Sequence, residues 1–336
     1  MNVLVTGGAG YIGSHAVKSL RLAGHRVVVV DNLSRGFRAA VTGGVPLVVH
    51  ELGDWEHIRR VLHGNRIDCV MHFAAKAYVG ESVDDPLTYY RNNTAHALEL
   101  LYAMRLTGVQ RFVFSSTCAT YGEPSPEHIP INEQCPQQPI NPYGWSKFFV
   151  ERILLDHCRA TPDFSCAILR YFNVAGADRE GEIGEAHDPE THLIPIILEA
   201  ALGLRPHVEI FGTDYPTPDG TCIRDYIHVE DLIDAHLLCM NALAPGRSFV
   251  YNLGIGKGHS VREIIDSAQR VTGKKIKVVQ GPRRPGDPPC LFADPARIQH
   301  ELGWSAKVAD IDAIIDSAWQ WLSRHPRRCT EQHPVD

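Results

Sequence analysis

Short apolar runs rich in β-branched residues alternate along the first half of the chain with amphipathic stretches of helical length. The apolar runs predict buried strands, and the amphipathic stretches predict helices. Such an alternation is typical of right-handed βαβ units, in which helices cover both faces of a parallel sheet. The expected strands are residues 2–6, 25–31, 68–75, 111–116 and 166–173, and the expected helices are residues 12–23, 88–107 and 143–160.

The pattern becomes less regular in the second half of the chain. A polar, glycine- and acid-rich loop is expected over 176–190, followed by a helix over 192–204 and a strand over 208–212. The stretch 225–240 predicts another helix and 249–254 another strand. Either of these elements could fold back onto the first domain.

We therefore predict an α/β fold, with a doubly wound parallel (Rossmann) sheet and a smaller, partly interleaved C-terminal substrate-binding domain. The first domain is expected to cover residues 1–173 and the second residues 174–336. Parts of about 225–255 are expected to return to the first domain.

Composition and charge exclude several classes of function. The chain has 336 residues, 44% of them hydrophobic and 21% charged, and no apolar run approaches the roughly 18 residues that span a bilayer. A net charge of -6 argues against a nucleic-acid surface. The start "MNVLVTGG" lacks the pattern of a secretory leader, so a cytoplasmic protein is expected.

Cysteine and histidine spacing indicates neither disulfides nor a metal. The nine cysteines are scattered without a C-x-x-C pair, which predicts reduced thiols. His187 and His192 lie near acidic residues but match no metal-ligand spacing, so no metal site is predicted.

The segment "VTGGAGYIGSH" follows the first expected strand and opens the first helix, with glycines at 7, 10 and 13. In this setting Gly7 permits a tight turn, Gly10 permits close approach of a pyrophosphate, and Gly13 permits close packing of helix on strand. The second strand ends in Asp31, where a carboxylate can accept hydrogen bonds from the adenosine ribose and repels a 2′-phosphate. The prediction is an NAD site, with Arg35 leaving NADP as the alternative and a turn-forming role as the alternative for Asp31.

The segment "NPYGWSK" contains the sequence's only Tyr-x-x-x-Lys, Tyr143 and Lys147. On a helix these positions share a face, so both side chains can reach one ligand. A phenol has a pKa near 10, and its use as a base near neutral pH requires a shift of roughly 3 units, which neighbouring positive charge can supply. We interpret the two residues as a catalytic pair rather than as two surface residues one turn apart.

These motifs, with "VVDNLSRG", "HFAAKAYVGES", "FSSTCATYG", "LRYFNVAGAD", "IRDYIHVEDL", "YNLGIGKGHSV" and "RRPGD", run from the start of the chain to about residue 325. In them the chain resembles the extended short-chain dehydrogenase/reductase superfamily, and most closely its nucleotide-sugar 4-epimerases. The resemblance implies tightly bound NAD and interconversion of UDP-galactose and UDP-glucose through a transient 4-keto sugar. It also implies a homodimer formed through the helices expected over 88–107 and 143–160.

Carried over residue by residue, the resemblance implies three groups of site residues. Tyr143, Lys147 and Thr117 are the expected catalytic residues. The expected cofactor residues are Gly7, Gly10, Tyr11, Ile12, Gly13, Asp31, Asn32, Leu33, Ser34, Arg35, Gly36, Asp54, Trp55, Phe73, Ala74, Ala75, Lys76, Asn92, Thr117, Tyr143, Lys147 and Phe172. The expected UDP-sugar residues are Thr117, Tyr143, Asn173, His192, Leu193, Phe211, Arg224, Tyr226, Arg284, Asp287 and Leu291.

Thr117 distinguishes the expected reaction from dehydration. In related dehydratases the matching threonine is followed by an acid pair that carries protons during elimination, whereas Cys118 and Ala119 stand here. Two departures from the family concern the sugar. His192 replaces an asparagine, and Leu291 stands where a large tyrosine excludes N-acetylated hexoses and a small residue admits them.

The substrate expectation is therefore UDP-glucose/UDP-galactose, with UDP-N-acetylhexosamines and UDP-pentoses such as UDP-arabinose as alternatives. Other classes are a dehydratase or decarboxylase, an NAD(P) oxidoreductase that releases reduced cofactor, and a non-catalytic dinucleotide sensor. Neither nucleic acid nor a membrane is expected as a partner.

Overall fold

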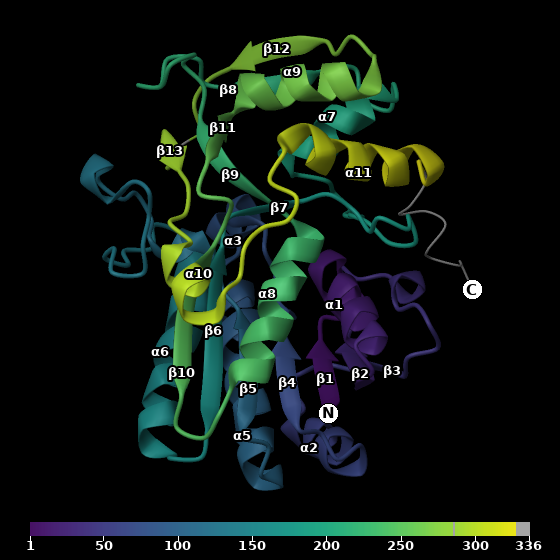
Figure 1. Ribbon diagram of the computed structural model, residues 1–336, viewed down its shortest axis with the longest axis vertical. Coiled ribbons are helices and arrows are strands. Elements are labelled where there is room, and N and C mark those ends of the chain that lie inside the picture. The colour runs from purple at the N-terminus through teal and green to yellow at the C-terminus, as the bar shows by residue number, and fades with distance from the viewer. Residues whose placement is uncertain (285, 327–336) are drawn as a thin grey trace. The chain divides into compact units, whose positions relative to one another are not determined.

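The computed structural model describes residues 1–284 and 286–326, and the chain in it divides into two compact units. The first unit comprises residues 1–122, 136–170 and 233–251. The second comprises the intervening segments and the C-terminal part from residue 252. Figure 1 labels the strands and the longer helices of both units.

A seven-stranded sheet forms the centre of the first unit, in the order β10-β6-β5-β4-β1-β2-β3. Every pairing from β6 to β3 is parallel. The strands are β1 (Asn2–Thr6), β2 (Arg26–Asp31), β3 (Leu47–Val49), β4 (Cys69–His72), β5 (Arg111–Ser115), β6 (Ser165–Tyr171) and β10 (Ser248–Leu253). This sheet confirms the predicted doubly wound α/β class.

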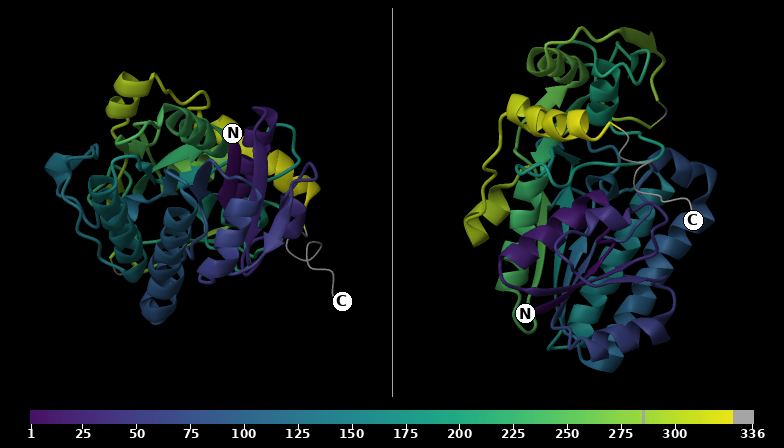
Figure 2. Two further views of the ribbon diagram at one scale, coloured as in Figure 1. Left: turned by 90° about the horizontal axis from the view of Figure 1, so that it is seen from below. Right: turned by 90° about the vertical axis from the view of Figure 1, so that its right-hand side faces the viewer.

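Helices cover both faces of the sheet, as the unbroken valine run of β2 requires. Val28 and Val30 face a core built with α2, α5 and α6, whereas Val29 packs near Val17 of α1. Figures 1 and 2 show α1 and α8 on the face opposite α2, α5 and α6. The main helices are α1 (Tyr11–Leu22), α2 (Trp55–Gly64), α5 (His96–Thr107), α6 (Pro142–Ala160) and α8 (Val229–Ala242).

Shorter helical pieces complete the first unit. They are η1 (Arg38–Ala40), α3 (Val79–Asp84), α4 (Pro86–Tyr89), η2 (Tyr90–Ala95) and η3 (Cys118–Thr120). The helix expected over 88–107 is therefore not regular, because η2 is a π-helical segment between α4 and α5.

The second unit contains two small sheets. Strand β9 (Ile223–His228) lies between β11 (Gly258–Ser260) and β13 (Cys290–Leu291), and its last three residues pair in parallel with β7 (Asn173–Ala175). Strand β8 (Val208–Phe211) pairs in parallel with β12 (Val278–Gly281). The helices are η4 (Pro126–His128), α7 (Leu193–Ala201), α9 (Val261–Thr272), α10 (Ala296–Leu302) and α11 (Ile311–Arg324).

The helix predicted over 225–240 is wrong at its start, because residues 223–228 form β9 and the helix begins at Val229. Tertiary contacts decide this boundary. The buried carboxylate of Asp225 accepts hydrogen bonds from the backbone amides of Ile255, Gly256 and Ala293. These contacts with two distant segments hold residues 223–228 in an extended conformation.

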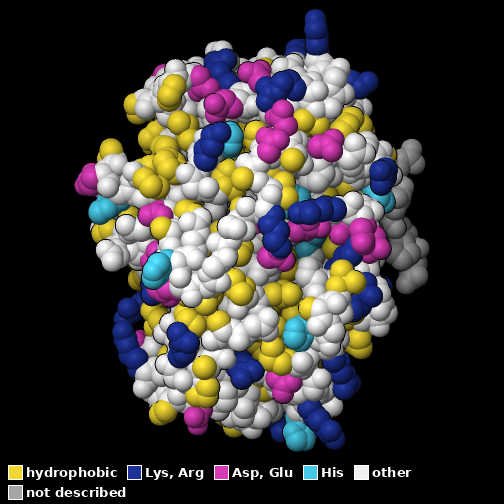
Figure 3. Space-filling model, viewed as in Figure 1, with side chains coloured by type: hydrophobic (Ala, Val, Ile, Leu, Met, Phe, Trp, Pro, Cys, Tyr) yellow, Lys and Arg dark blue, Asp and Glu magenta, His cyan; other side chains and the backbone are white. Residues whose placement is uncertain are grey.

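Within the described part of the chain, no helix is long and apolar enough to cross a membrane. On the face shown in Figure 3, basic and acidic side chains are interspersed rather than gathered by sign. The eight cysteines within the described residues are all free thiols, and Cys329 lies outside those residues.

Candidate active site

The carboxyl ends of four neighbouring parallel strands carry most of the predicted cofactor residues. Residues 7–13 follow β1, 31–36 follow β2, 73–76 follow β4, and Thr117 follows β5. Because adjacent parallel strands end at one edge, the fold brings these segments together where open α/β sheets bind ligands. The predicted cofactor residues outside these segments are Asp54, Trp55, Asn92, Tyr143 and Lys147 in the first unit and Phe172, which is buried in the second unit.

The structure of the glycine turn distinguishes its three glycines. Gly7 has a φ of +71°, and a Cβ added there would lie 2.5 Å from the backbone nitrogen of Ala74. A Cβ at Gly13 would lie 2.1 Å from the carbonyl oxygen of Gly7, so helix and turn require glycine for contact. At Gly10 an added Cβ would meet no described atom closer than 3.4 Å. The chain itself does not demand glycine at position 10, which fits the space that a bound pyrophosphate needs there.

This contrast predicts separable effects of Gly10→Ala and Gly13→Ala. Gly13→Ala overpacks the turn and is expected to lower the free energy of unfolding by about 1–3 kcal/mol. Gly10→Ala is expected to leave that free energy nearly unchanged but to lower the amount of NAD retained on purification. Denaturant titration of the NAD-free proteins and cofactor content per chain measure the two effects. Equal NAD retention by Gly10→Ala and wild type would contradict the assignment of this turn.

Asp31 ties the glycine turn to the end of β2. Its two carboxylate oxygens accept hydrogen bonds from the backbone amides of Ala9 (3.0 Å) and Leu33 (2.8 Å), and burial raises its pKa. Each oxygen can accept a further bond, so the turn-forming and ribose-binding roles are compatible. The guanidinium of Arg35 forms an ion pair with Glu81 at 3.0 Å and stacks over the ring of Tyr78. The cation that could have bound the 2′-phosphate of NADP therefore already has partners in the chain.

The remaining predicted cofactor residues of the first unit have structural partners. Asp54 caps α2 by accepting from the amide of His57, and Trp55 packs edge-on against Tyr102. Asn92 donates to the side chain of Asn93. Asn93 is a residue of this region that the sequence did not predict. The side-chain amide of Asn93 is buried. It bonds both backbone groups of Lys76 and the hydroxyl of Ser146, and so links the segment after β4 to α6.

Helix α6 places Tyr143 and Lys147 at the sheet edge. Asn141 caps the helix by accepting from the amide of Gly144, and Pro142 occupies the first turn, so the helix starts one residue before Tyr143. Tyr143 is 9% exposed and Lys147 3% exposed, so the interpretation as two surface residues is wrong. The Nζ of Lys147 donates to the carbonyl of Ser115 at 2.8 Å, which joins this helical face to the end of β5.

Burial lowers the pKa of Lys147 to about 7, although the nearby Glu151 opposes that shift. In the chain without ligands, Lys147 therefore loses its proton more readily than an exposed lysine does. Only its protonated form, the ammonium, favours a phenolate at Tyr143. A phenolate would in turn favour the ammonium, so the two groups are expected to titrate as a coupled pair.

Replacing Lys147 by methionine is expected to change how stability depends on pH. Since the folded pKa of Lys147 is about 7 and its ordinary value is 10.5, the unfolded chain binds more protons between these values, and wild-type stability rises with pH there. The methionine variant lacks the free-energy cost of burying an amine that is protonated in the unfolded chain. We expect its stability advantage to be largest below about pH 7, on the order of a few kcal/mol, and to shrink toward about pH 10. Denaturant titrations of NAD-free protein across this range measure it, and parallel pH profiles for the two proteins would contradict the assignment.

Thr117 caps the short η3 turn directly after β5. Its hydroxyl oxygen accepts a hydrogen bond from the amide of Ala119 at 3.1 Å, and its side chain is largely buried. Cys118 and Ala119 follow it in this turn, so no carboxylate stands where the dehydratase acid pair would.

Glu151, one turn beyond Lys147 on the same helical face, is a second residue that sequence reasoning missed. Its buried carboxylate accepts from the hydroxyl of Ser116, from Gln137 at 2.9 Å, and from the guanidinium of Arg170 at 2.6–3.2 Å. Arg170 also donates to the hydroxyl of Tyr121 at 2.8 Å. The network anchors the backbone between Ser115 and Thr117. No local pattern signals it, because its members are far apart in the sequence.

The predicted UDP-sugar residues of the second unit form three groups. In the first, Arg224 on β9 pairs with Asp287 and lies in register with Leu291 of β13. Asn173 of β7 lies in register with Tyr226, whose pKa is raised by burial.

In the second group the guanidinium of Arg284 lies 3.9 Å from the ring centroid of Phe211. Phe211 is half-buried and not part of the core. The third pair, His192 and Leu193, stands at the start of α7, and Nδ1 of His192 lies 3.0 Å from Oε1 of Glu190. The ligand roles of these residues stay predictions.

Comparison with known proteins places this geometry in a family. The model of the NAD-dependent epimerase/dehydratase family matches residues 3–254. A UDP-glucose 4-epimerase from Azospirillum brasilense is 51% identical, covering 95% of this chain and 91% of the relative. A probable UDP-arabinose 4-epimerase from Oryza sativa subsp. japonica is 47% identical, covering 97% of this chain and 83% of the relative. The crystal structure of UDP-glucose 4-epimerase from Brucella ovis in complex with NAD is 49% identical with a TM-score of 0.90, covering 95% of this chain and 97% of that one.

Proposed function

Because the chain belongs to the NAD-dependent epimerase/dehydratase family and is an NAD-dependent UDP-sugar 4-epimerase, we propose that its substrates are UDP-glucose and UDP-galactose. The observation that carries the chemistry is that Tyr143 and Lys147 are both buried and that Lys147 donates to the carbonyl of Ser115, two residues before Thr117. A UDP-glucose 4-epimerase is also the relative with 51% identity.

In the proposed reaction Tyr143 removes the proton of the sugar 4-hydroxyl, and Thr117 hydrogen-bonds the 4-oxygen. NAD⁺, when bound, accepts the C4 hydride and returns it, so the net redox change is zero. The 4-keto sugar turns over about its link to the diphosphate and is reduced on its other face. Tyr143 then returns the proton to the 4-oxygen.

Such a cycle needs a firmly held nucleotide and a loosely held sugar ring. Arg224 and Arg284 are the proposed diphosphate anchors, since a guanidinium can pair with two phosphate oxygens at once. The turn after Thr117 lacks the carboxylates that elimination would require, which supports epimerisation over dehydration.

A pentose is the main rival of the hexose, because the rice relative named as a probable UDP-arabinose 4-epimerase is 47% identical. Leu291 is buried beside Arg224, and its intermediate bulk supports a hexose without an N-acetyl group. UDP-arabinose is the second candidate, supported by that relative, and a UDP-N-acetylhexosamine is the third.

Competition kinetics on one preparation test the sugar. With UDP-galactose, UDP-N-acetylgalactosamine and UDP-arabinose present together and no cofactor added, we expect the highest kcat/KM for UDP-galactose. A higher kcat/KM for UDP-arabinose would identify the pentose, and not the hexose, as the preferred substrate. Release of NADH in proportion to substrate consumed would overturn epimerisation itself.

We also propose the homodimer that the family resemblance implies. Leu98, Tyr102 and Leu106 recur every four residues along α5 and are each at least 38% exposed, and Phe149 of α6 is exposed as well. An apolar stripe of this kind is typical of a surface that a partner covers. Sedimentation velocity is expected to show a dimer that Leu98→Asp dissociates, whereas Leu204→Asp, at an exposed leucine of the second unit, should not.

A further inference from the structure

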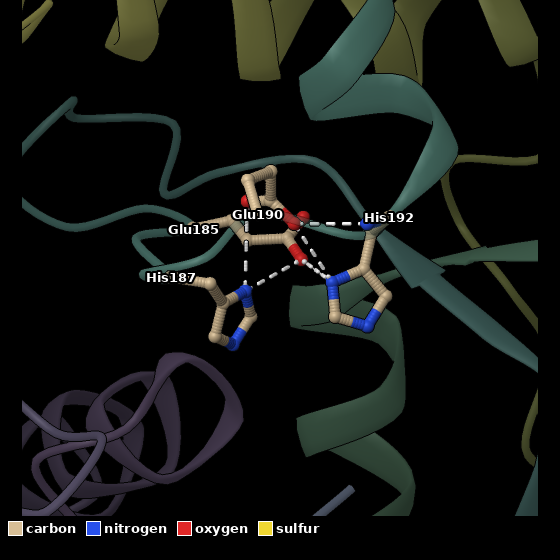
Figure 4. Close-up of side chains that lie close together, drawn as sticks. All are labelled: Glu185, His187, Glu190 and His192. Atoms are coloured by element: carbon tan, nitrogen blue, oxygen red, sulfur yellow. Dashed lines mark hydrogen bonds and ion pairs between the residues drawn. The ribbon is translucent and has the colours of Figure 1, made fainter. Parts of the chain in front are cut away.

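Four ligand-type side chains converge in the segment that leads into α7. Figure 4 shows Glu185, His187, Glu190 and His192 turned toward one another. Nδ1 of His187 lies 3.2 Å from Oε1 of Glu185 and 3.6 Å from Oε2 of Glu190. Nδ1 of His192 lies 3.0 Å from Oε1 of each glutamate. One ligand atom from each residue can be chosen so that all four lie within 4.8 Å of one another.

The separations between the imidazole nitrogens and the carboxylate oxygens are close to those in a four-coordinate metal site. Zinc binds imidazole nitrogen and carboxylate oxygen at about 2.0–2.2 Å, which places neighbouring ligand atoms of a tetrahedron roughly 3.3–3.6 Å apart. The four histidine–glutamate distances, 3.0 to 3.6 Å, lie in or just below this range. Glu190 meets His187 through Oε2 and His192 through Oε1, so its carboxylate must present a single oxygen when an ion binds.

The surroundings of the cluster favour a cation. Glu185 and Glu190 are both buried, and two carboxylates held close together away from water need compensating positive charge. Glu190 is also oriented by the amides of Thr191 and His192, each 2.9 Å from Oε1, in the manner of contacts that hold a ligand in place.

We propose that Glu185, His187, Glu190 and His192 bind one divalent transition-metal ion, with zinc as the best match. Two imidazole ligands disfavour magnesium and calcium, which prefer oxygen, and two carboxylates without a thiolate suit zinc. Four protein ligands fill a tetrahedron, so the site is structural rather than catalytic. The ion would fasten the segment 185–192 to the start of α7, where Leu193 stands. Coordination through Nδ1 leaves Nε2 of His192 for the sugar contact predicted from the sequence.

Protons are the competing occupants. Burial lowers the pKa of His192, but the two glutamates outweigh that effect and raise it to about 10, so a protonated imidazole can also neutralise the cluster. Metal binding would displace this proton, which makes the two occupants distinguishable by titration with metal.

The test uses the full, untagged chain with its NAD, purified without added metal or chelator. Elemental analysis is expected to find about one zinc per chain, and substitution by Co²⁺ should give the visible absorption bands of tetrahedral cobalt. His187→Ala and the conservative Glu190→Gln should each lower zinc content at least ten-fold, with NAD content and circular dichroism reporting that they are folded. Removal of metal by a chelator should lower the Tm of wild type, and added zinc should restore it.

His57→Ala is the matched control, because His50, Asp54 and His57 form another group of possible ligands in the first unit. Its zinc content should equal that of wild type. Loss of zinc in His57→Ala with retention in His187→Ala would overturn the proposal. So would a wild-type Tm that zinc leaves unchanged together with absent cobalt bands, since the cluster would then be held by protons alone.

Discussion

Replacing Tyr143 by phenylalanine is expected to lower kcat for the proposed substrate, UDP-galactose, by about 10²- to 10⁴-fold, the range typical of the loss of a positioned general base. The ring remains, so its packing against Tyr89, 6.5 Å away between centroids, is kept. NAD content and the affinity for UDP should stay close to wild type, because the lost oxygen is assigned to the reacting 4-hydroxyl and not to the anchors. Steady-state kinetics and equilibrium binding measure the two quantities.

Tyr89→Phe is the matched control. It removes another largely buried phenol oxygen, which donates to the carbonyl of Tyr78 and to Glu81. This variant is expected to lose some stability and to keep most of its turnover. If Tyr143→Phe turned over at a rate near that of Tyr89→Phe, Tyr143 would not be the base.

The second large effect is on stability. Replacing Glu151 by leucine leaves the buried guanidinium of Arg170 without its counter-charge, and removal of one partner of a buried ion pair costs about 3–5 kcal/mol. Denaturant titration is expected to show a fall of this size. Since Glu151 also holds Ser116, next to Thr117, kcat should fall in any fraction that remains folded.

The double variant Glu151→Leu with Arg170→Leu measures the interaction energy between the two side chains. Because it removes both buried charges, its loss should be smaller than the sum of the two single losses, with a coupling of about 0.5–3 kcal/mol. Additive losses would show that the two side chains act independently, contrary to the contacts between them.

Several features of the site could be read from local sequence. The valine run of β2 predicted a strand buried on both faces, and the structure confirms it. The glycines at 7 and 13 were predicted from the turn they form, and each is required by contacts of under 3 Å. The segment 225–228 was mistaken for helix because its extended form depends on partners at residues 255, 256 and 293.

The sequence by itself determined the doubly wound class and the family, because the alternation of apolar and amphipathic stretches and the motifs can be read along the chain. It also predicted the NAD turn and the Tyr143–Lys147 pair, because each lies within one turn or one helical face. Only the tertiary structure decided that Lys147 is desolvated enough to bring its pKa to about 7 and that Glu151 meets Arg170. It alone showed that two glutamates and two histidines share one small volume. The physical reason is that burial and charge pairing depend on which distant segments meet and on how an irregular loop turns, and neither leaves a periodic trace along the chain.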